Sequence, residues 1–467
     1  MIFSFHFKKK ILFTDSLCRF HSKELLQNRL SGKTSTNMKL IVSCEDTGAL
    51  KVVTAQHGVD TSRPAPKDDP NAVAPPTITT HATGYSRKSR VVHMVKSPKT
   101  GNIAVTRSDG SVQVYDTAKL RNNEVCNDDS ELLPLLSEHK NVIPESTNKD
   151  NEVFVDLAVD DIGRLLTATN KGTLFIWSSE EKLSDNPANY QLPLKPNEVV
   201  ETFQLHPGKT DDTLYIAYGG KETDLRIVKL PTSSGHSETP EIVFAAKNVS
   251  NSKLELRVPI HIKKILFDKS STPENFKLYT FTQWGDLRFY DSSQGRKPRY
   301  SKLILPSKGP VTNAIWMNDD FVVTNTSGIV EKVNSTSGSQ VCQFKDHIGS
   351  IQSLFNFNDS ILVTAGTDRY VRAYNNKTRD CIVKVFVGTQ SNAVILLEDS
   401  ETLGRHKANI IGDRALESIR KQEEYMARKA SAAAEDSGEE SDEDELWSKL
   451  DSSSVTQRRK RRKITLA

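Results

Sequence analysis

Residues 103–116 read IAVTRSDGSVQVYD, and this stretch decides the fold of the chain. Apolar and polar residues alternate on both sides of a polar turn, which is the pattern of two half-buried strands joined by a tight hairpin. Gly110 follows Asp109 in that turn, where a two-residue hairpin needs a positive φ. The stretch therefore predicts an antiparallel pair of strands with one face directed towards a core.

The same pattern occurs seven times. The other six copies span residues 40–53, 165–177, 214–228, 278–291, 321–333 and 361–374. Successive copies begin roughly 40–65 residues apart, which leaves room for about four short strands each and is the spacing of propeller blades. Because blades bury their faces only against their neighbours, a chain of 467 residues can pass the usual size limit of a single core. We expect an all-β, seven-bladed β-propeller over residues 38–388.

Two segments lie outside the repeats. Residues 1–37 carry seven Lys/Arg and two acidic residues, and we expect a disordered or non-native extension there, with a processed leader as the alternative. Residues 389–467 are expected to form a C-terminal tail with a helical segment, an acidic block and a basic stretch. The acidic block holds eight Asp/Glu in residues 435–445, a density that cannot bury enough apolar surface to fold alone.

Three short motifs stand out in this tail. Leu446, Trp447 and Leu450 form an apolar island at helical spacing, interpreted as a docking peptide, with a chance occurrence as the alternative. Ser437 and Ser441 each have an acidic residue three positions later, as in substrates of acidophilic kinases, and their phosphorylation is left open. A run of six bases is a candidate nuclear-localisation signal, or else a solvated tail without a receptor; it comprises Arg458, Arg459, Lys460, Arg461, Arg462 and Lys463.

Charge is unevenly distributed along the chain, whose formal net charge is +4. Residues 119–161 hold 11 Asp/Glu against 4 Lys/Arg, whereas residues 246–310 hold 13 Lys/Arg against 5 Asp/Glu. One side of the ring is therefore expected to be basic and another acidic. In the basic stretch Arg and Lys could follow phosphates and Tyr300 could stack on a base, so nucleic acid, an acidic protein and a solvated rim all stay open.

Catalytic motifs are scarce. The sequence has no phosphate loop, H-E-x-x-H, G-x-S-x-G or Cys/His metal spacing, no apolar run approaching 18 residues, and no polar cluster expected to converge on the central channel. The best polar set comprises His347, Thr364, Asp368 and Tyr374 in the last repeat. In WD-type repeats such an Asp bonds the His and the strand Ser/Thr within one blade, so we expect a structural network rather than a catalytic relay. We expect no catalytic residue, metal or cofactor.

Several segments carry a resemblance to a known family, in order and spacing over about 410 residues. They are MKLIVSC (38–44), AKNV (246–249), LRVP (256–259), GRKP (295–298), GTDRYVR (366–372), VFVG (385–388) and DELWSKL (444–450). The chain resembles the Nop-seven-associated protein one family of nucleolar WD-repeat ribosome-assembly factors. The first 37 residues depart from that family's pattern.

The resemblance implies a WD-repeat-like propeller and a non-enzymatic factor in biogenesis of the large (60S) ribosomal subunit, acting in nucleolar pre-60S (66S) particles and supporting rRNA processing. The implied partners are the particle, through its assembly factors or its rRNA, and an AAA-type remodelling ATPase, with no membrane and no small-molecule substrate. The residues assigned to docking are Lys247, Asn248, Arg257, Pro259, Arg296, Lys297, Pro298, Arg369 and Arg372. The alternative is a nuclear interaction scaffold outside ribosome assembly, for example on chromatin.

Overall fold

In a computed structural model of the chain, the described residues are 37–63, 73–121, 132–144, 152–208, 213–231, 240–251, 254–305 and 309–400. The chain divides into two compact units, Met1–Glu401 and Thr402–Ala467. Every element below belongs to the first unit. The extension over residues 1–36 lies outside the described residues, as do the apolar island at 446–450, the basic run at 458–463, Ser437 and Ser441.

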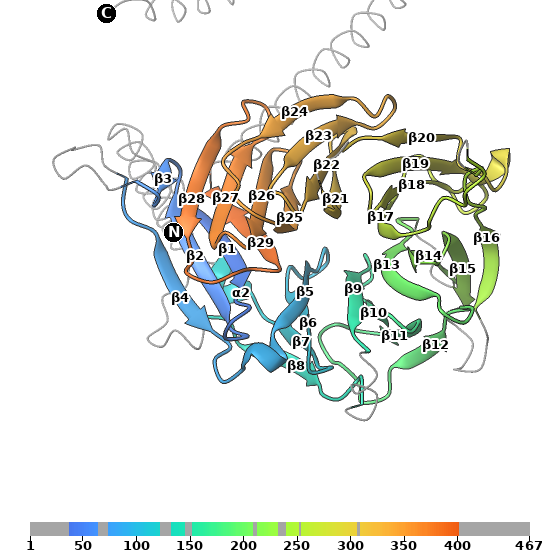
Figure 1. Cartoon of the computed structure of the whole chain (residues 1–467). Coiled ribbons are helices and arrows are strands. Elements are labelled where there is room, and N and C mark those ends of the chain that lie inside the picture. Colours follow the sequence, from blue (N-terminus) through green and yellow to red (C-terminus); the bar gives the residue numbers. More distant parts are fainter. Residues whose placement is uncertain are drawn as a thin grey trace, which may run out of the picture. The chain divides into compact units, whose positions relative to one another are not determined.

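The first unit consists of seven separate sheets, which Figure 1 shows arranged around a common centre. From inner to outer strand, the first four are β29 (Val394–Asp399), β1 (Asn37–Ser43), β2 (Leu50–Gln56), β4 (Thr77–His81); β5 (Val91–Lys96), β6 (Ile103–Arg107), β7 (Val112–Tyr115), β8 (Leu135–His139); β9 (Phe154–Val159), β10 (Leu165–Thr169), β11 (Thr173–Trp177), β12 (Ala188–Gln191); and β13 (Val199–Leu205), β14 (Thr213–Lys221), β15 (Arg226–Pro231), β16 (Glu241–Ala245).

The other three sheets are β17 (Ile262–Phe267), β18 (Lys277–Thr282), β19 (Asp286–Asp291), β20 (Tyr300–Leu303); β21 (Val311–Met317), β22 (Asp320–Asn325), β23 (Val330–Asn334), β24 (Gln340–Phe344); and β25 (Ile351–Phe357), β26 (Ile361–Gly366), β27 (Tyr370–Asn375), β28 (Cys381–Phe386), β3 (Val59–Asp60). The short helices are η1 (Arg87–Ser89), α2 (Ala118–Arg121) and η3 (Ser292–Gln294). No helix in the described ranges is long and apolar enough to cross a membrane.

Each sequence repeat forms the two middle strands of one sheet. The pairs are β1–β2, β6–β7, β10–β11, β14–β15, β18–β19, β22–β23 and β26–β27. All of them are antiparallel, and each is flanked by one inner and one outer strand of the same sheet. The predicted seven-bladed β-propeller is therefore confirmed.

The turns of the repeats explain why glycine recurs in them. Gly110 has a φ of 83°, and a Cβ at this position would lie 2.7 Å from the carbonyl oxygen of Ile143. In the last repeat Arg369 takes the equivalent place with a φ of 63°. Its carbonyl accepts the N–H of Val387 at 2.9 Å, just as the carbonyl of Gly110 accepts that of Val142 at 3.0 Å. A non-glycine residue in this conformation costs roughly 1–2 kcal/mol.

The hydrophobic core is divided into seven clusters of buried side chains among the described residues, and each cluster is shared by two neighbouring sheets. One example joins Val112 and Val114 of β7 to Leu165 of β10 and Trp177 of β11. The clusters follow one another round the whole set of sheets without a break. The ring is thus closed by packing, blade against blade.

One sheet joins the two ends of the propeller. Its innermost strand, β29, comes from the C-terminal side and pairs antiparallel with β1, from Met38 opposite Asp399 to Val42 opposite Val394. The expected propeller boundary at residue 388 stops short of this strand. The reason is that β29 has no hairpin partner adjacent in sequence, so no turn pattern marks it.

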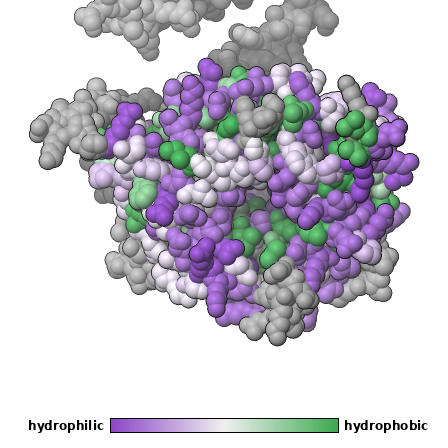
Figure 2. Space-filling view, viewed as in Figure 1, coloured by the Kyte–Doolittle hydropathy of each residue, from purple (hydrophilic) through white to green (hydrophobic). Residues whose placement is uncertain are grey.

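The inner strands surround a central channel with a volume of about 720 Å³. Figure 2 shows that the face in view is mainly hydrophilic and is hollowed near its middle, where hydrophobic residues gather. The seventh sheet gains its fifth strand because β3 pairs in parallel with the outer edge of β28.

Candidate functional site

Two of the predicted docking residues, Arg257 and Arg296, line one cavity of about 750 Å³. Residues 193–198, which lead into β13, form one wall, and residues 222–226 in the β14–β15 turn form another. The loop that follows β16 and the turn that follows β19 complete it. We call this cavity the basic groove; its cationic lining residues are Lys195, Arg226, Arg257 and Arg296.

Hydrogen bonds hold the loops of the basic groove together. The backbone N–H of Lys247 donates to the carbonyl oxygen of Arg296 at 2.8 Å, and the Arg296 guanidinium donates to the carbonyl oxygen of Ala245. The side-chain amide of Asn248 donates to the carbonyl oxygen of Val258 at 2.6 Å, and Asn248 also accepts a bond from Arg288 at 3.3 Å. Asn248 therefore fixes the loop rather than offering its side chain to a partner.

The carboxylates of the basic groove are engaged with its arginines. Glu198 and Arg226 pair at 2.6 Å, and Glu222 pairs with Arg257 at 3.1 Å. Burial raises the pKa of Glu198, but hydrogen bonds from Arg226 and from the backbone N–H of Lys195 outweigh burial and lower it. The pKa of Asp224 is raised, because burial exceeds the opposing pull of the nearby arginines.

Five cations around the basic groove have exposed side chains and no carboxylate partner among the described residues: Lys195, Lys247, Arg296, Lys297 and Arg299. Pro259 is exposed beside the buried Ile260, and Pro298 is half-buried after Lys297. The structure thus brings together the predicted segments around Lys247, Arg257 and Arg296. These unpaired cations make the groove the strongest candidate for a docking surface.

Several bases of the stretch 246–310 are used inside the ring instead. Lys263 pairs with Glu201 at 2.5 Å, and Lys264 pairs with Asp156 at 2.7 Å. Arg288 is 2% exposed. The predicted basic side of the ring is accordingly smaller than the composition indicates.

The two arginines assigned from the last repeat do not join the basic groove. Arg369 is exposed at the β26–β27 turn, two sheets further round the ring. Arg372 is only 2% exposed, and its guanidinium lies 2.6 Å from the carboxylate of Asp368. The assignment of Arg372 to a docking surface is therefore wrong, because the alternation along β27 turns its side chain into the blade.

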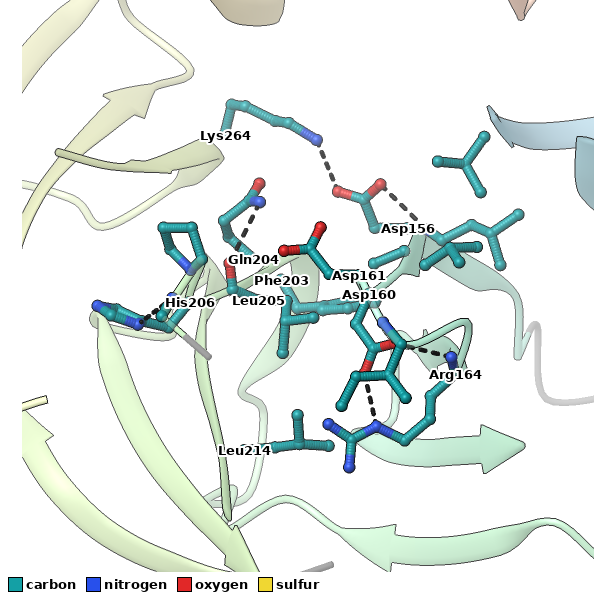
Figure 3. A pocket seen from close by; sticks show the side chains of 17 residues that line it. Asp156, Asp160, Asp161, Arg164, Phe203, Gln204, Leu205, His206, Leu214 and Lys264 are labelled. Atoms are coloured by element: carbon teal, nitrogen blue, oxygen red, sulfur yellow. Dashed lines mark hydrogen bonds and ion pairs between the residues drawn. The ribbon is translucent and has the colours of Figure 1, made fainter. Parts of the chain in front are cut away.

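A polar cluster does converge on the central channel, contrary to the expectation from the sequence. Figure 3 shows Lys264 reaching Asp156, with Asp160 and Arg164 paired nearby at 2.5 Å, around a neighbouring cavity of about 360 Å³. Glu201 contacts both Lys263 and Nε2 of His261, the latter at 2.8 Å. These charges are paired with one another. In the described part of the chain no group of three or more His, Cys, Asp or Glu could hold a metal ion.

The polar set of the last repeat is assembled within one blade. Nε2 of His347 lies 2.9 Å from the hydroxyl of Thr364, and the hydroxyl of Tyr374 donates to the carbonyl oxygen of Lys345 at 2.6 Å. Asp368 pairs with Arg372 instead of His347, because the buried guanidinium needs a counter-charge. The expected Asp–His bond is thus replaced by an Asp–Arg pair.

Burial makes His347 a source of acid sensitivity. Burial, reinforced by the Arg372 cation, lowers its pKa to about 3. The unfolded chain binds this proton at about pH 6.5, so stability falls as the pH drops below that value. Relative to His347→Gln, we expect the wild type to lose about 1.4 kcal/mol of unfolding free energy per pH unit between about pH 6 and 4. Urea unfolding at several pH values measures this; parallel pH profiles for the two proteins would contradict it.

Sequence reasoning missed the residues that give the basic groove its opposite wall. They are Lys195 and Glu198 before β13, and Glu222, Asp224 and Arg226 around the β14–β15 turn. A usable signal was present, since the fourth repeat places a polar turn at residues 219–226. Neighbouring blades pack side by side, so this turn had to lie near the segment that leads into the next blade.

Comparison with known proteins gives two close matches in length. The chain is 30% identical over 395 residues to a protein of Meyerozyma guilliermondii named Ribosome biogenesis protein NSA1, covering 78% of this chain and 92% of that protein. It is 26% identical over 400 residues to the Yarrowia lipolytica protein of the same name, covering 79% and 90%. The solved β-propeller domain of Myceliophteria thermophila Cps50 (Swd1) aligns with a TM-score of 0.47 and 14% identity, over 64% of this chain and 87% of that domain. No protein-family model matches the sequence.

Proposed function

The chain belongs to the family of ribosome biogenesis proteins NSA1, and from that membership we propose that it is a non-enzymatic assembly factor for the large (60S) ribosomal subunit. In this proposal the protein is nuclear and nucleolar and docks on pre-60S (66S) particles. It supports rRNA processing there and leaves when an AAA-type ATPase remodels the particle. The structural observation that supports docking is the basic groove with its unpaired cations.

The basic groove suits a docking role because its cations are positioned before any partner arrives. Lys247 and Arg296 lie on loops that are hydrogen-bonded to each other, so few of the atoms involved have to be ordered on binding. Exposed cations also attract an anionic partner over about one Debye length, roughly 8–10 Å at physiological salt. Association through this surface should therefore weaken as the ionic strength rises.

Charge reversal in the basic groove tests the proposal. We expect the double variant Arg296→Glu/Lys297→Glu to sediment with precursor particles at least about tenfold less than the wild type, because attraction becomes repulsion at both positions. The measurement is co-sedimentation on sucrose gradients at physiological ionic strength, with salt titration of the wild type.

A matched control lies in the seventh sheet. Lys377 and Arg379 are exposed in the turn after β27, the counterpart of the turn after β19 that carries Arg296 and Lys297. The variant Lys377→Glu/Arg379→Glu should keep particle association. Unchanged sedimentation of the Arg296/Lys297 variant would refute docking through the groove, and a wild type that never travels with particles would favour a nuclear scaffold outside ribosome assembly.

A further inference from the structure

Exposed aliphatic side chains accompany the cations of the basic groove. Leu254 is 79% exposed and Leu256 is 64% exposed, on the loop that also carries Arg257. On β16, Ile242 and Val243 are 45% and 38% exposed, and Ile242 lines the groove. Single exposed aliphatic residues are ordinary, but four within 15 residues form the kind of patch that marks an interaction site.

The loop that carries the two leucines is held in place. Asn248 donates to the carbonyl oxygen of Val258 at 2.6 Å, and Asn251 donates to that of Glu255 at 3.1 Å. The ion pair of Arg257 with Glu222 ties the same loop to the β14–β15 turn. The leucines are therefore presented to solvent from a pinned segment, so their exposure is a property of the folded loop.

The aromatic group expected to receive a base is not available. Tyr300 is half-buried and stacks on Phe289 with 5.7 Å between ring centroids. Its hydroxyl donates to the carbonyl oxygen of Ser335 at 2.5 Å. Single-stranded nucleic acid gains much of its affinity from bases stacked on such rings, and no aromatic residue is among those that line the basic groove.

We infer that the basic groove binds an acidic protein segment that also carries large apolar side chains, an inference that rests on the proposed docking function. The apolar residues of the partner cover Leu254, Leu256 and Ile242, while its carboxylates face Lys247, Arg296 and Lys297. This follows the usual anatomy of protein interfaces, with an apolar centre and a polar rim. Phosphates gain nothing from the leucines, whereas such a segment uses both features. Glu241 and Glu255 are also exposed here, but the unpaired cations outnumber them.

Binding of defined probes to the purified full-length protein tests this inference. The probes are a fluorescent peptide in which glutamates alternate with leucines, the same peptide with serine in place of leucine, and an oligouridine of equal charge. The wild type should bind the leucine peptide at least about tenfold more tightly than the serine peptide, because leucine burial adds to the shared electrostatic attraction.

Two pairs of leucines separate the groove from non-specific effects. Leu254→Ser/Leu256→Ser should remove the preference for the leucine peptide and leave binding of oligouridine unchanged. Leu135 and Leu136 on β8 are also exposed, at 46% and 43%, so Leu135→Ser/Leu136→Ser is the matched control and should keep the preference. Tighter binding of oligouridine than of the leucine peptide, or a preference that survives Leu254→Ser/Leu256→Ser, would overturn the inference.

The two proposals fail in different ways. If Arg296→Glu/Lys297→Glu abolishes particle association but Leu254→Ser/Leu256→Ser does not, docking through the groove stands and the apolar partner segment is refuted. If particle association survives the charge reversal while the peptide preference depends on the leucines, the proposed docking function fails and the chemistry of the groove stands.

Discussion

A chain ended after Gly388 is expected to be unfolded, whereas a chain ended after Glu401 is expected to keep the propeller. The first truncation removes β29, whose Val394, Ile395, Leu396 and Leu397 are at most 4% exposed. Burying each of these side chains is worth about 1.5–3 kcal/mol, or about 6–12 kcal/mol together. That is comparable to the entire stability of a typical domain, about 5–15 kcal/mol.

The comparison between the two truncations isolates the strand from the tail. Both lack residues 402–467, so a difference between them reports only on residues 389–401. Circular dichroism with thermal melting, supported by limited proteolysis, measures the outcome. A cooperative transition at the same temperature in both truncated chains would show that β29 is dispensable for closing the ring.

Trp177→Ala is expected to destabilise the protein by about 3–5 kcal/mol, the range for removing a buried aromatic side chain. Trp177 is fully buried in the cluster shared by the second and third sheets. Its ring meets His139 edge-on at 5.7 Å, and Nε1 donates to the carbonyl oxygen of Ser184 at 3.2 Å. The cavity would therefore open at a contact between two blades and weaken both.

The same chemical change at an exposed tryptophan provides the control. Trp284 is 46% exposed at the β18–β19 turn and meets His261 at 5.9 Å between ring centroids. Trp284→Ala should cost less than about 1 kcal/mol, since little buried surface is lost. Urea unfolding of both variants measures the difference, and equal losses would mean that the packing between blades does not determine stability.

The hairpins of the propeller could be predicted from the sequence because their signal is local. Each repeat contains two alternating strands and a turn, and residues such as Gly110 and Gly328 have the positive φ that such turns require. β29 gave no such signal, since its partner β1 lies at the other end of the propeller. Its side chains are buried on both faces, so its run of four apolar residues shows no alternation.

The site could be predicted in part for the same reason. Lys247, Arg257 and Arg296 lie in a stretch whose basic composition is visible in the sequence, and the fold brings them to one groove. Composition could not show that Lys263 and Lys264 point inward, because their carboxylate partners Glu201 and Asp156 lie on other sheets. Burial of Arg372 depended on the register of β27, which a repeat pattern alone does not fix.

Pairing β29 with β1 also has a consequence during protein synthesis. Roughly 350 residues separate the end of β1 from the start of β29, and ribosomes add about 5–20 residues per second, so β1 waits for its neighbour for roughly 20–70 s. During that time Leu40 and Ile41 lack the covering strand, and the backbone edge of β1 is an open template for other nascent chains. The emerging polypeptide therefore depends on chaperone protection until its last inner strand has been translated.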